Sequence, residues 1–220
     1  MRPLQGIDAS YHNGGDLPIN VDFALIRVSF GMPDGRALPD ESAERHFDRL
    51  ARARVPVLAA YHYLSTAAGA ATGEDQAYVF LARHAAMEAR FGPLGMACDS
   101  EPLRAKDAAG NPIPWDPAER VRDRVMGWLA AMPRRPCLLY GSREWWARLK
   151  LPWWTALHCP FWAASPPPNG VPAPWTVATI QQLIEPVGGV DRNVFDGSAE
   201  ELRAVLGIEA PAEAYCPTTG

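Results

Sequence analysis

The chain has 220 residues, of which 48% are hydrophobic, and this length and composition suit one domain with a substantial core. Its 21 Lys and Arg residues against 25 Asp and Glu residues give a formal net charge of -4 at pH 7. The chain therefore lacks the basic field that holds a polyanion, and nucleic acid is not expected as a partner. We expect one compact monomeric unit over residues 1–207 and a loosely attached C-terminal tail over residues 208–220.

The first half alternates short apolar segments with helical patterns. Strands are predicted at residues 6–10, 23–30, 55–63 and 95–101, and helices at residues 41–54, 74–90 and 117–132. The third helix is expected to begin with Asp116 as N-cap and Pro117 at its first position. This alternation is typical of parallel strands joined by crossover helices.

The second half contains strands with few helices between them. Strands are predicted at residues 137–140, 160–164, 177–184 and 191–195, a short helix at residues 145–149, and a last helix capped by Ser198 that runs to Leu206. The proline-rich segment 165–174 cannot be helical, because proline lacks a backbone donor and clashes with the preceding turn. About eight strands with fewer than eight full helices indicate an α/β fold, a distorted TIM-like barrel, with a doubly wound open sheet as the alternative.

The cysteine spacing shows no paired motif, and the hydropathy indicates neither a signal peptide nor a membrane span. Cys98, Cys137, Cys159 and Cys216 form no C-x-x-C pair, and the first three lie in apolar segments, where we expect buried free thiols. The N-terminus lacks a charged region followed by an apolar stretch, and no segment approaches the ~20 apolar residues of a spanning helix. We expect no signal peptide and no membrane span.

Acidic residues stand at the ends of several predicted strands, where a β/α barrel gathers its active site. Asp8 ends the first strand, Asp99 and Glu101 end the fourth, and Asp191 opens the last. Because strand side chains alternate, Asp99 and Glu101 should point to the same side and share one space. Crowding raises the pKa of one carboxyl and leaves a proton donor beside an ionised partner. Glycoside hydrolysis needs such a pair.

Besides a pair of carboxylates, a sugar-binding site needs aromatic side chains. Tyr61 and Tyr140 end predicted strands, and of the eight Trp residues Trp162 is the one expected to reach the cleft. His12 and His62 carry no metal-ligand spacing, so no metal or cofactor is expected. Motifs of serine hydrolases, dinucleotide-binding proteins and P-loop proteins are absent from the sequence.

The ordered set of motifs resembles glycoside hydrolase family 25, the Chalaropsis-type lysozymes. The resemblance covers about residues 6–206 and rests on the segments GIDAS (6–10), FALIRV (23–28), AAYHY (59–63), DSE (99–101), LYGS (139–142), FWAA (161–164) and GVDRNVFDG (189–197). It implies a barrel of five β/α units followed by three strands with few helices.

The resemblance also implies hydrolysis of the β-1,4 bond between N-acetylmuramic acid and N-acetylglucosamine in peptidoglycan. Glu101 would be the general acid/base and Asp99 its carboxylate partner, with Asp8 and Asp191 as flanking acids. The resemblance also makes Tyr61 a substrate-contacting aromatic. With the flanking acids, Tyr140, Trp162 and Gln182 complete the expected substrate-binding residues. One departure is that Gln181-Gln182-Leu183 replaces the Trp-Gln-Tyr usual in the seventh strand.

Three questions stay open at this stage. Asp99 either attacks the anomeric carbon or orients the substrate's own N-acetyl group to do so. The chain is either an enzyme or a glycan-binding barrel without turnover, and its polymer is either peptidoglycan or another amino-sugar polymer such as chitin. We expect synthesis in the cytoplasm and action on the cell wall after release or export, as for a phage or prophage endolysin.

Overall fold

The computed structural model describes residues 2–14, 17–102, 109–133, 136–164, 171–187 and 189–208. The strands are β1 (Leu4–Ala9), β2 (Phe23–Gly31), β3 (Ala37–Pro39), β4 (Val57–Tyr63), β5 (Gly95–Asp99), β6 (Cys137–Gly141), β7 (Phe161–Ala163), β8 (Ile180–Val187) and β9 (Val190–Phe195). The helices are α1 (Ala43–Arg52), α2 (Gly73–Phe91), α3 (Ala118–Ala131), α4 (Arg143–Leu149), α5 (Thr155–His158) and α6 (Ala199–Val205).

Eight of these strands close into a barrel. The sheet runs in the order β1-β9-β8-β7-β6-β5-β4-β2-β3, and β1 also pairs with β2, so the ring closes and β3 is left outside it on β2. Within the ring, the neighbours in the series β1-β2-β4-β5-β6-β7-β8 are parallel, whereas β9 is antiparallel to both β8 and β1. β3 pairs antiparallel with β2. The predicted barrel is confirmed, and the open-sheet alternative is wrong.

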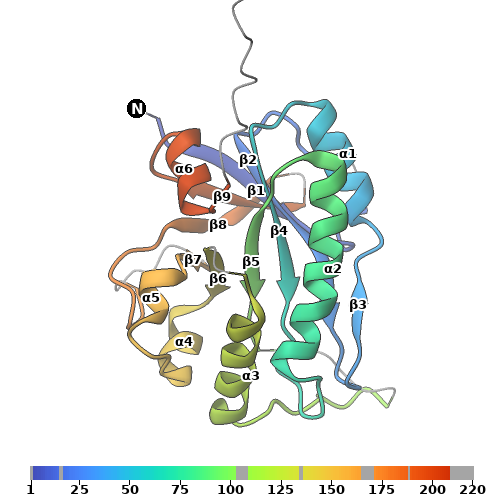
Figure 1. Ribbon diagram of the computed structural model, residues 1–220, viewed down its shortest axis with the longest axis vertical. Helices are drawn as coiled ribbons and strands as arrows, with labels where there is room; N and C mark the ends of the chain where they lie inside the picture. Colours follow the sequence, from blue (N-terminus) through green and yellow to red (C-terminus); the bar gives the residue numbers. More distant parts are fainter. Residues whose placement is uncertain are drawn as a thin grey trace, which may run out of the picture.

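Helices cover the first part of the barrel more fully than the second (Figure 1). Helices follow β3, β4, β5 and β6, while β8 leads to β9 without a helix in the described part of the chain. This agrees with the loss of helices read from the sequence. β1 is an exception to the expected pattern, since no helix follows it among the described residues.

The start of α3 corrects one prediction. Its N-cap is Pro117 rather than Asp116. The carboxylate of Asp116 is used elsewhere, because it accepts a hydrogen bond from Arg124 at 2.6 Å and lies 3.5 Å from Arg120. Two short elements, β3 and α5, were not predicted, and their three and four residues are too few to show a periodic pattern. The predicted Ser198 cap of α6 is confirmed, with Ser198 and Glu201 forming a capping box.

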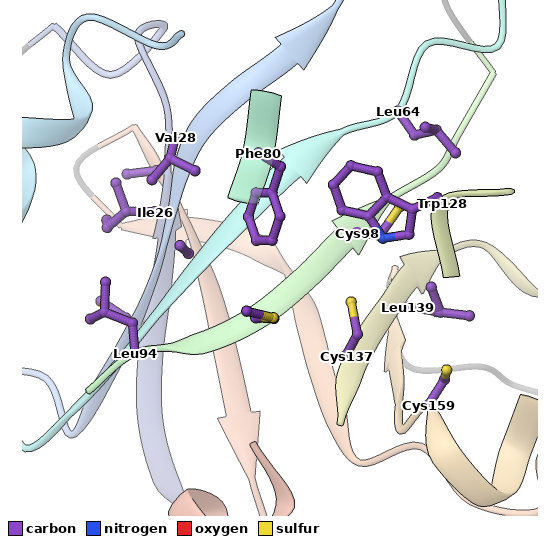
Figure 2. Packing of buried hydrophobic residues seen from close by; sticks show 14 of the residues in the cluster. Ile26, Val28, Leu64, Phe80, Leu94, Cys98, Trp128, Cys137, Leu139 and Cys159 are labelled. Carbon is purple, nitrogen blue, oxygen red and sulfur yellow. The ribbon is translucent and has the colours of Figure 1, made fainter. Parts of the chain in front are cut away.

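Alternation along the strands divides the core into two layers. The outer layer lies between the sheet and its helices, where Phe80 of α2 and Trp128 of α3 pack over the strands (Figure 2). Cys98, Cys137 and Cys159 are buried free thiols of this layer, as predicted, and Cys216 lies outside the described residues. No helix in the described residues is long and apolar enough to cross a membrane.

The inner layer fills one end of the barrel. The inward residues include Phe23, Leu25, Val57, Leu138 and Ile180, and Leu202 of α6 and the C-cap residue Leu206 pack against them. Helix α6 lies at the end of the barrel where β4 and β5 begin (Figure 1). Ile208 joins this layer, so the chain is packed through the first residue of the expected tail, and residues 209–220 lie outside the described residues. With this end closed, the described part of the barrel opens into a cleft at the carboxyl ends of the parallel strands.

Candidate active site

A cleft of about 820 Å³ lies at the carboxyl ends of the parallel strands. Each residue singled out from the sequence as a site residue lines it: Asp8, Tyr61, Asp99, Glu101, Tyr140, Trp162, Gln182 and Asp191. These residues come from β1, β4, β5, β6, β7, β8 and β9, or directly follow them. The fold therefore gathers side chains that are up to 183 positions apart in the chain into one space.

The reversed direction of β9 explains how Asp191 reaches this cleft. Asp191 is near the start of its strand, and in a fully parallel barrel that position would lie at the closed end. Because β9 runs antiparallel to β1, its first residues lie beside the last residues of β1, and Asp191 pairs with Asp8. Two acids from opposite ends of the sequence thus become direct neighbours.

Asp99 and Glu101 face the same cleft because the strand alternation continues beyond β5. Ser100 points away from the cleft: its hydroxyl accepts a hydrogen bond from the indole N–H of Trp145 at 3.3 Å. Its backbone N–H donates to the carbonyl of Tyr140 at 3.1 Å, which extends the pairing with β6. The hydroxyl of Thr66 donates to the carbonyl of Glu101 at 3.1 Å and anchors the backbone of that residue.

Burial and mutual repulsion raise the pKa of several acids in the cleft. The pKa of Asp99 rises well above its usual value because the carboxyl is buried and lies near Glu101 and Asp8, an effect that Arg27 partly opposes. Burial raises the pKa of Asp8 to about 7, against the lowering effect of two amide hydrogen bonds. Partial burial also raises the pKa of Asp191. Such a cluster holds protons near neutral pH and can donate one.

A chain of hydrogen bonds fixes Asp8. Its Oδ2 accepts from Nδ2 of Asn193 at 2.8 Å and from Nε2 of Gln182 at 3.0 Å. Oδ1 of Asn193 accepts from the indole N–H of Trp162 at 2.7 Å, and Oε1 of Gln182 accepts from the Tyr140 hydroxyl at 2.8 Å. The sequence reading missed Asn193, although its place two residues after Asp191 puts it on the same face of the strand.

Comparisons with known proteins agree with this geometry at the level of the fold. No family model matches the chain, and no curated protein sequence does. Among solved structures, a family GH25 lysozyme from Aspergillus fumigatus superposes with a TM-score of 0.71 at 20% identity, covering 93% of this chain and 99% of that one. The chain has the fold of the glycoside hydrolase family 25 lysozymes.

Two further structures support this assignment of the fold. A bacterial lysozyme from Streptomyces coelicolor has a TM-score of 0.67 at 22% identity, covering 93% of this chain and 97% of that chain. A muramidase from Trichobolus zukalii has a TM-score of 0.68 at 17% identity, with 92% and 98% covered. The similarity therefore extends over nearly the whole length of each protein.

Three aromatic rings form the base of the cleft in this lysozyme fold. The ring centroids of Trp162 and Tyr140 are 4.5 Å apart, and those of Trp162 and Tyr61 are 5.9 Å apart. Trp162 is only 1% exposed, so it lines the cleft as a buried support while its N–H positions Asn193. Burial raises the pKa of the Tyr61 and Tyr140 hydroxyls, which keeps them protonated as donors.

The two histidines near strand ends differ in place. His62 points into the outer layer, where Nδ1 lies 2.8 Å from the Ser29 hydroxyl and Nε2 3.2 Å from Oε1 of Gln76. Burial lowers the pKa of His62 to about 3, so the ring is neutral. His12 lines the cleft. In the part of the chain that is described, no group of three or more His, Cys, Asp and Glu residues is placed to hold a metal ion.

The Gln181-Gln182-Leu183 motif of the seventh predicted strand lies on β8. Ile180 is part of the inner layer and Gln182 binds Asp8, so alternation turns Gln181 to the opposite face of β8. The residue that replaces the family's Trp therefore does not line the cleft. Gln182, which matches the family motif, keeps its place beside Asp8.

Proposed function

We propose that this protein is a lysozyme (muramidase) that hydrolyses the β-1,4 bond between N-acetylmuramic acid and N-acetylglucosamine in bacterial peptidoglycan. The observation that carries the proposal is the convergence of Asp8, Asp99, Glu101 and Asp191 in one cleft at the open end of a lysozyme-type barrel. A cluster of four acids is unfavourable for folding because of charge repulsion and burial, which points to a role in chemistry.

Glu101 is the proposed general acid/base. It lies at the cleft beyond the end of β5, less buried than Asp99, where a glycosidic oxygen can approach it. In the first step Glu101 gives its proton to the leaving oxygen while the sugar develops positive charge. In the second step it removes a proton from the attacking water, so the anomeric configuration is retained overall.

Asp99 is the proposed carboxylate partner. Burial and the neighbouring Glu101 raise the pKa of Asp99, because both destabilise its ionised form. The ionised carboxylate is therefore a strong base. The positive charge that develops on the sugar attracts this carboxylate, so ionised Asp99 becomes more stable as the transition state forms. This holds both for direct attack on the anomeric carbon and for orientation of the substrate's N-acetyl group.

Two measurements separate these roles of Asp99. Direct attack leaves a glycosyl group on a peptide containing Asp99, which mass spectrometry of a rapidly quenched reaction detects. Attack by the N-acetyl group forms a cyclic oxazolinium instead, and a stable thiazoline analogue of that ring should then inhibit the enzyme competitively. A labelled Asp99 peptide contradicts the second route, and thiazoline inhibition without a label contradicts the first.

Clearing of purified cell walls tests the proposed activity. Wild-type protein should reduce the turbidity of a peptidoglycan suspension, and Glu101→Gln should slow this by at least about 10²-fold, the usual contribution of a general acid. Glu144→Gln, a change at an exposed acid of α4, is the matched control and should clear at the wild-type rate. Binding without clearing by the wild type would instead indicate a glycan-binding barrel, and equal rates for Glu101→Gln would remove Glu101 from the mechanism.

A further inference from the structure

The aromatic residues expected to contact sugar have almost no exposed surface. Tyr61, Tyr140 and Trp162 are 6%, 8% and 1% exposed, so none offers a ring face on which a pyranose can stack. Another aromatic residue of the same cleft, Tyr11, is 49% exposed. Tyr11 follows β1 in the chain, three positions after Asp8, and was not singled out from the sequence.

Tyr11 is held in place although it is exposed. Its backbone N–H donates to Oδ2 of Asp40 at 3.0 Å. The guanidinium of Arg27 lies over its ring, 4.5 Å from the centroid, and the ring of His12 is 3.9 Å away. The contacts fix the ring at the edge of the cleft before any ligand binds.

The support beneath Tyr11 is itself rigid. Arg27 is buried, and its Nε donates to Oδ2 of Asp40 at 2.9 Å. The other carboxylate oxygen of Asp40 accepts from the backbone N–H and the hydroxyl of Ser42, at 3.0 and 2.6 Å. One carboxylate thus orders both the tyrosine backbone and the cation that packs on the ring.

We propose that Tyr11 is a sugar-stacking subsite of the cleft, on which a pyranose ring of the bound glycan packs through its C–H face. This proposal rests on the proposed function for the identity of the glycan. A ring that is already ordered loses little conformational entropy when the sugar binds, which favours affinity. The cation over the ring adds to this order, since it restrains the side chain through a cation–π contact.

The test measures binding separately from turnover. In a Glu101→Gln background, binding of peptidoglycan strands freed of their peptides is compared for the parent and for added Tyr11→Ala, Tyr11→Phe and Tyr78→Ala changes. Tyr78 is 65% exposed on α2, outside the cleft, and serves as the matched control. Tyr11→Ala should raise Kd about tenfold, equivalent to about 1.4 kcal/mol. Tyr11→Phe and Tyr78→Ala should change Kd by less than about twofold.

The outcomes separate this proposal from the proposed function. Unchanged Kd in Tyr11→Ala overturns the subsite, even where the wild type cleaves peptidoglycan. A tenfold loss of binding in Tyr11→Ala together with an inactive wild type supports the subsite and overturns the enzyme. A parent that binds no glycan strand overturns the subsite, while clearing of cell walls by the wild type still decides the proposed function. Because Tyr11 and Tyr78 are exposed, we expect all three added variants to unfold at the same temperature as the parent. A drop in Tm confined to Tyr11→Ala would assign Tyr11 a structural role instead.

Discussion

Replacing Asp8 with Asn should make the protein more stable at alkaline pH. The carboxyl of Asp8 has a pKa of about 7 in the folded chain against 3.8 in its ordinary state, chiefly because it is buried. An ionised Asp8 therefore opposes folding. Asn preserves the local geometry, since one amide oxygen can accept both hydrogen bonds that Oδ2 now receives from Gln182 and Asn193.

The size of this effect follows from the two pKa values. One unit of pKa corresponds to about 1.4 kcal/mol, so a rise from 3.8 to about 7 gives an upper bound of about 4 kcal/mol. Water in the open cleft screens part of this, and we expect about 2 kcal/mol. Because the folded pKa is the higher one, the penalty is absent below about pH 4, grows between pH 4 and 7, and is complete above pH 7.

Urea denaturation at pH 4 and pH 8 measures this difference. Asp8→Asn should exceed the wild type in free energy of unfolding by about 2 kcal/mol at pH 8 and nearly equal it at pH 4. Asp196→Asn, which removes an exposed carboxylate outside the cleft, should show no such pH dependence. A variant Asp8→Asn that is no more stable than the wild type at pH 8 would refute the idea that charge crowding in the cleft works against folding.

Two other predictions follow from buried groups. Trp162→Phe removes the N–H that serves Asn193 and should lower the free energy of unfolding by about 2–4 kcal/mol, from an unsatisfied acceptor and a small cavity. Trp153→Phe, at a 72% exposed side chain, should stay within about 0.5 kcal/mol in the same denaturation experiment; equal losses in both would contradict the role of the indole N–H. In a Cys216→Ser variant, Cys98, Cys137 and Cys159 should resist a thiol reagent until denaturant is added, because burial blocks access and raises the pKa of each thiol. Rapid labelling of the native protein would show that the outer layer opens.

The position of the acids was predictable where it depends on a local rule. Alternation along a strand places Asp99 and Glu101 on one side, and the structure shows both lining the cleft. The barrel, and the small number of helices in its second half, were likewise predictable from segment lengths and prolines. The rule extends one residue beyond β5 because Ser100 continues the pairing with Tyr140.

Features set by tertiary contacts could not be read in the same way. The pairing of β9 with β1, which brings Asp191 beside Asp8, joins opposite ends of the chain and does not follow from the local sequence of either strand. Asp116 matched the pattern of a helix cap, yet the nearby Arg124 competes for its carboxylate.

The exposure of the aromatic residues in the cleft, and the side chains that contact them, could not be predicted from the sequence either. Trp162 and Tyr11 are both aromatic residues near strand ends, and nothing in their local sequences says that the first is buried and the second exposed. Nor does the sequence show that the carboxylate of Asp40 supports Tyr11, because that contact joins residues 29 positions apart.

Identification of the new reducing sugar tests the central claim most directly. Purified peptidoglycan is digested, and borohydride converts the new reducing ends to sugar alcohols. The products are then separated and identified by mass spectrometry. The proposed muramidase should yield the alcohol of muramic acid from the wild type and from Glu144→Gln, and none from Glu101→Gln. The alcohol of glucosamine, or no new reducing end from the wild type, would contradict it.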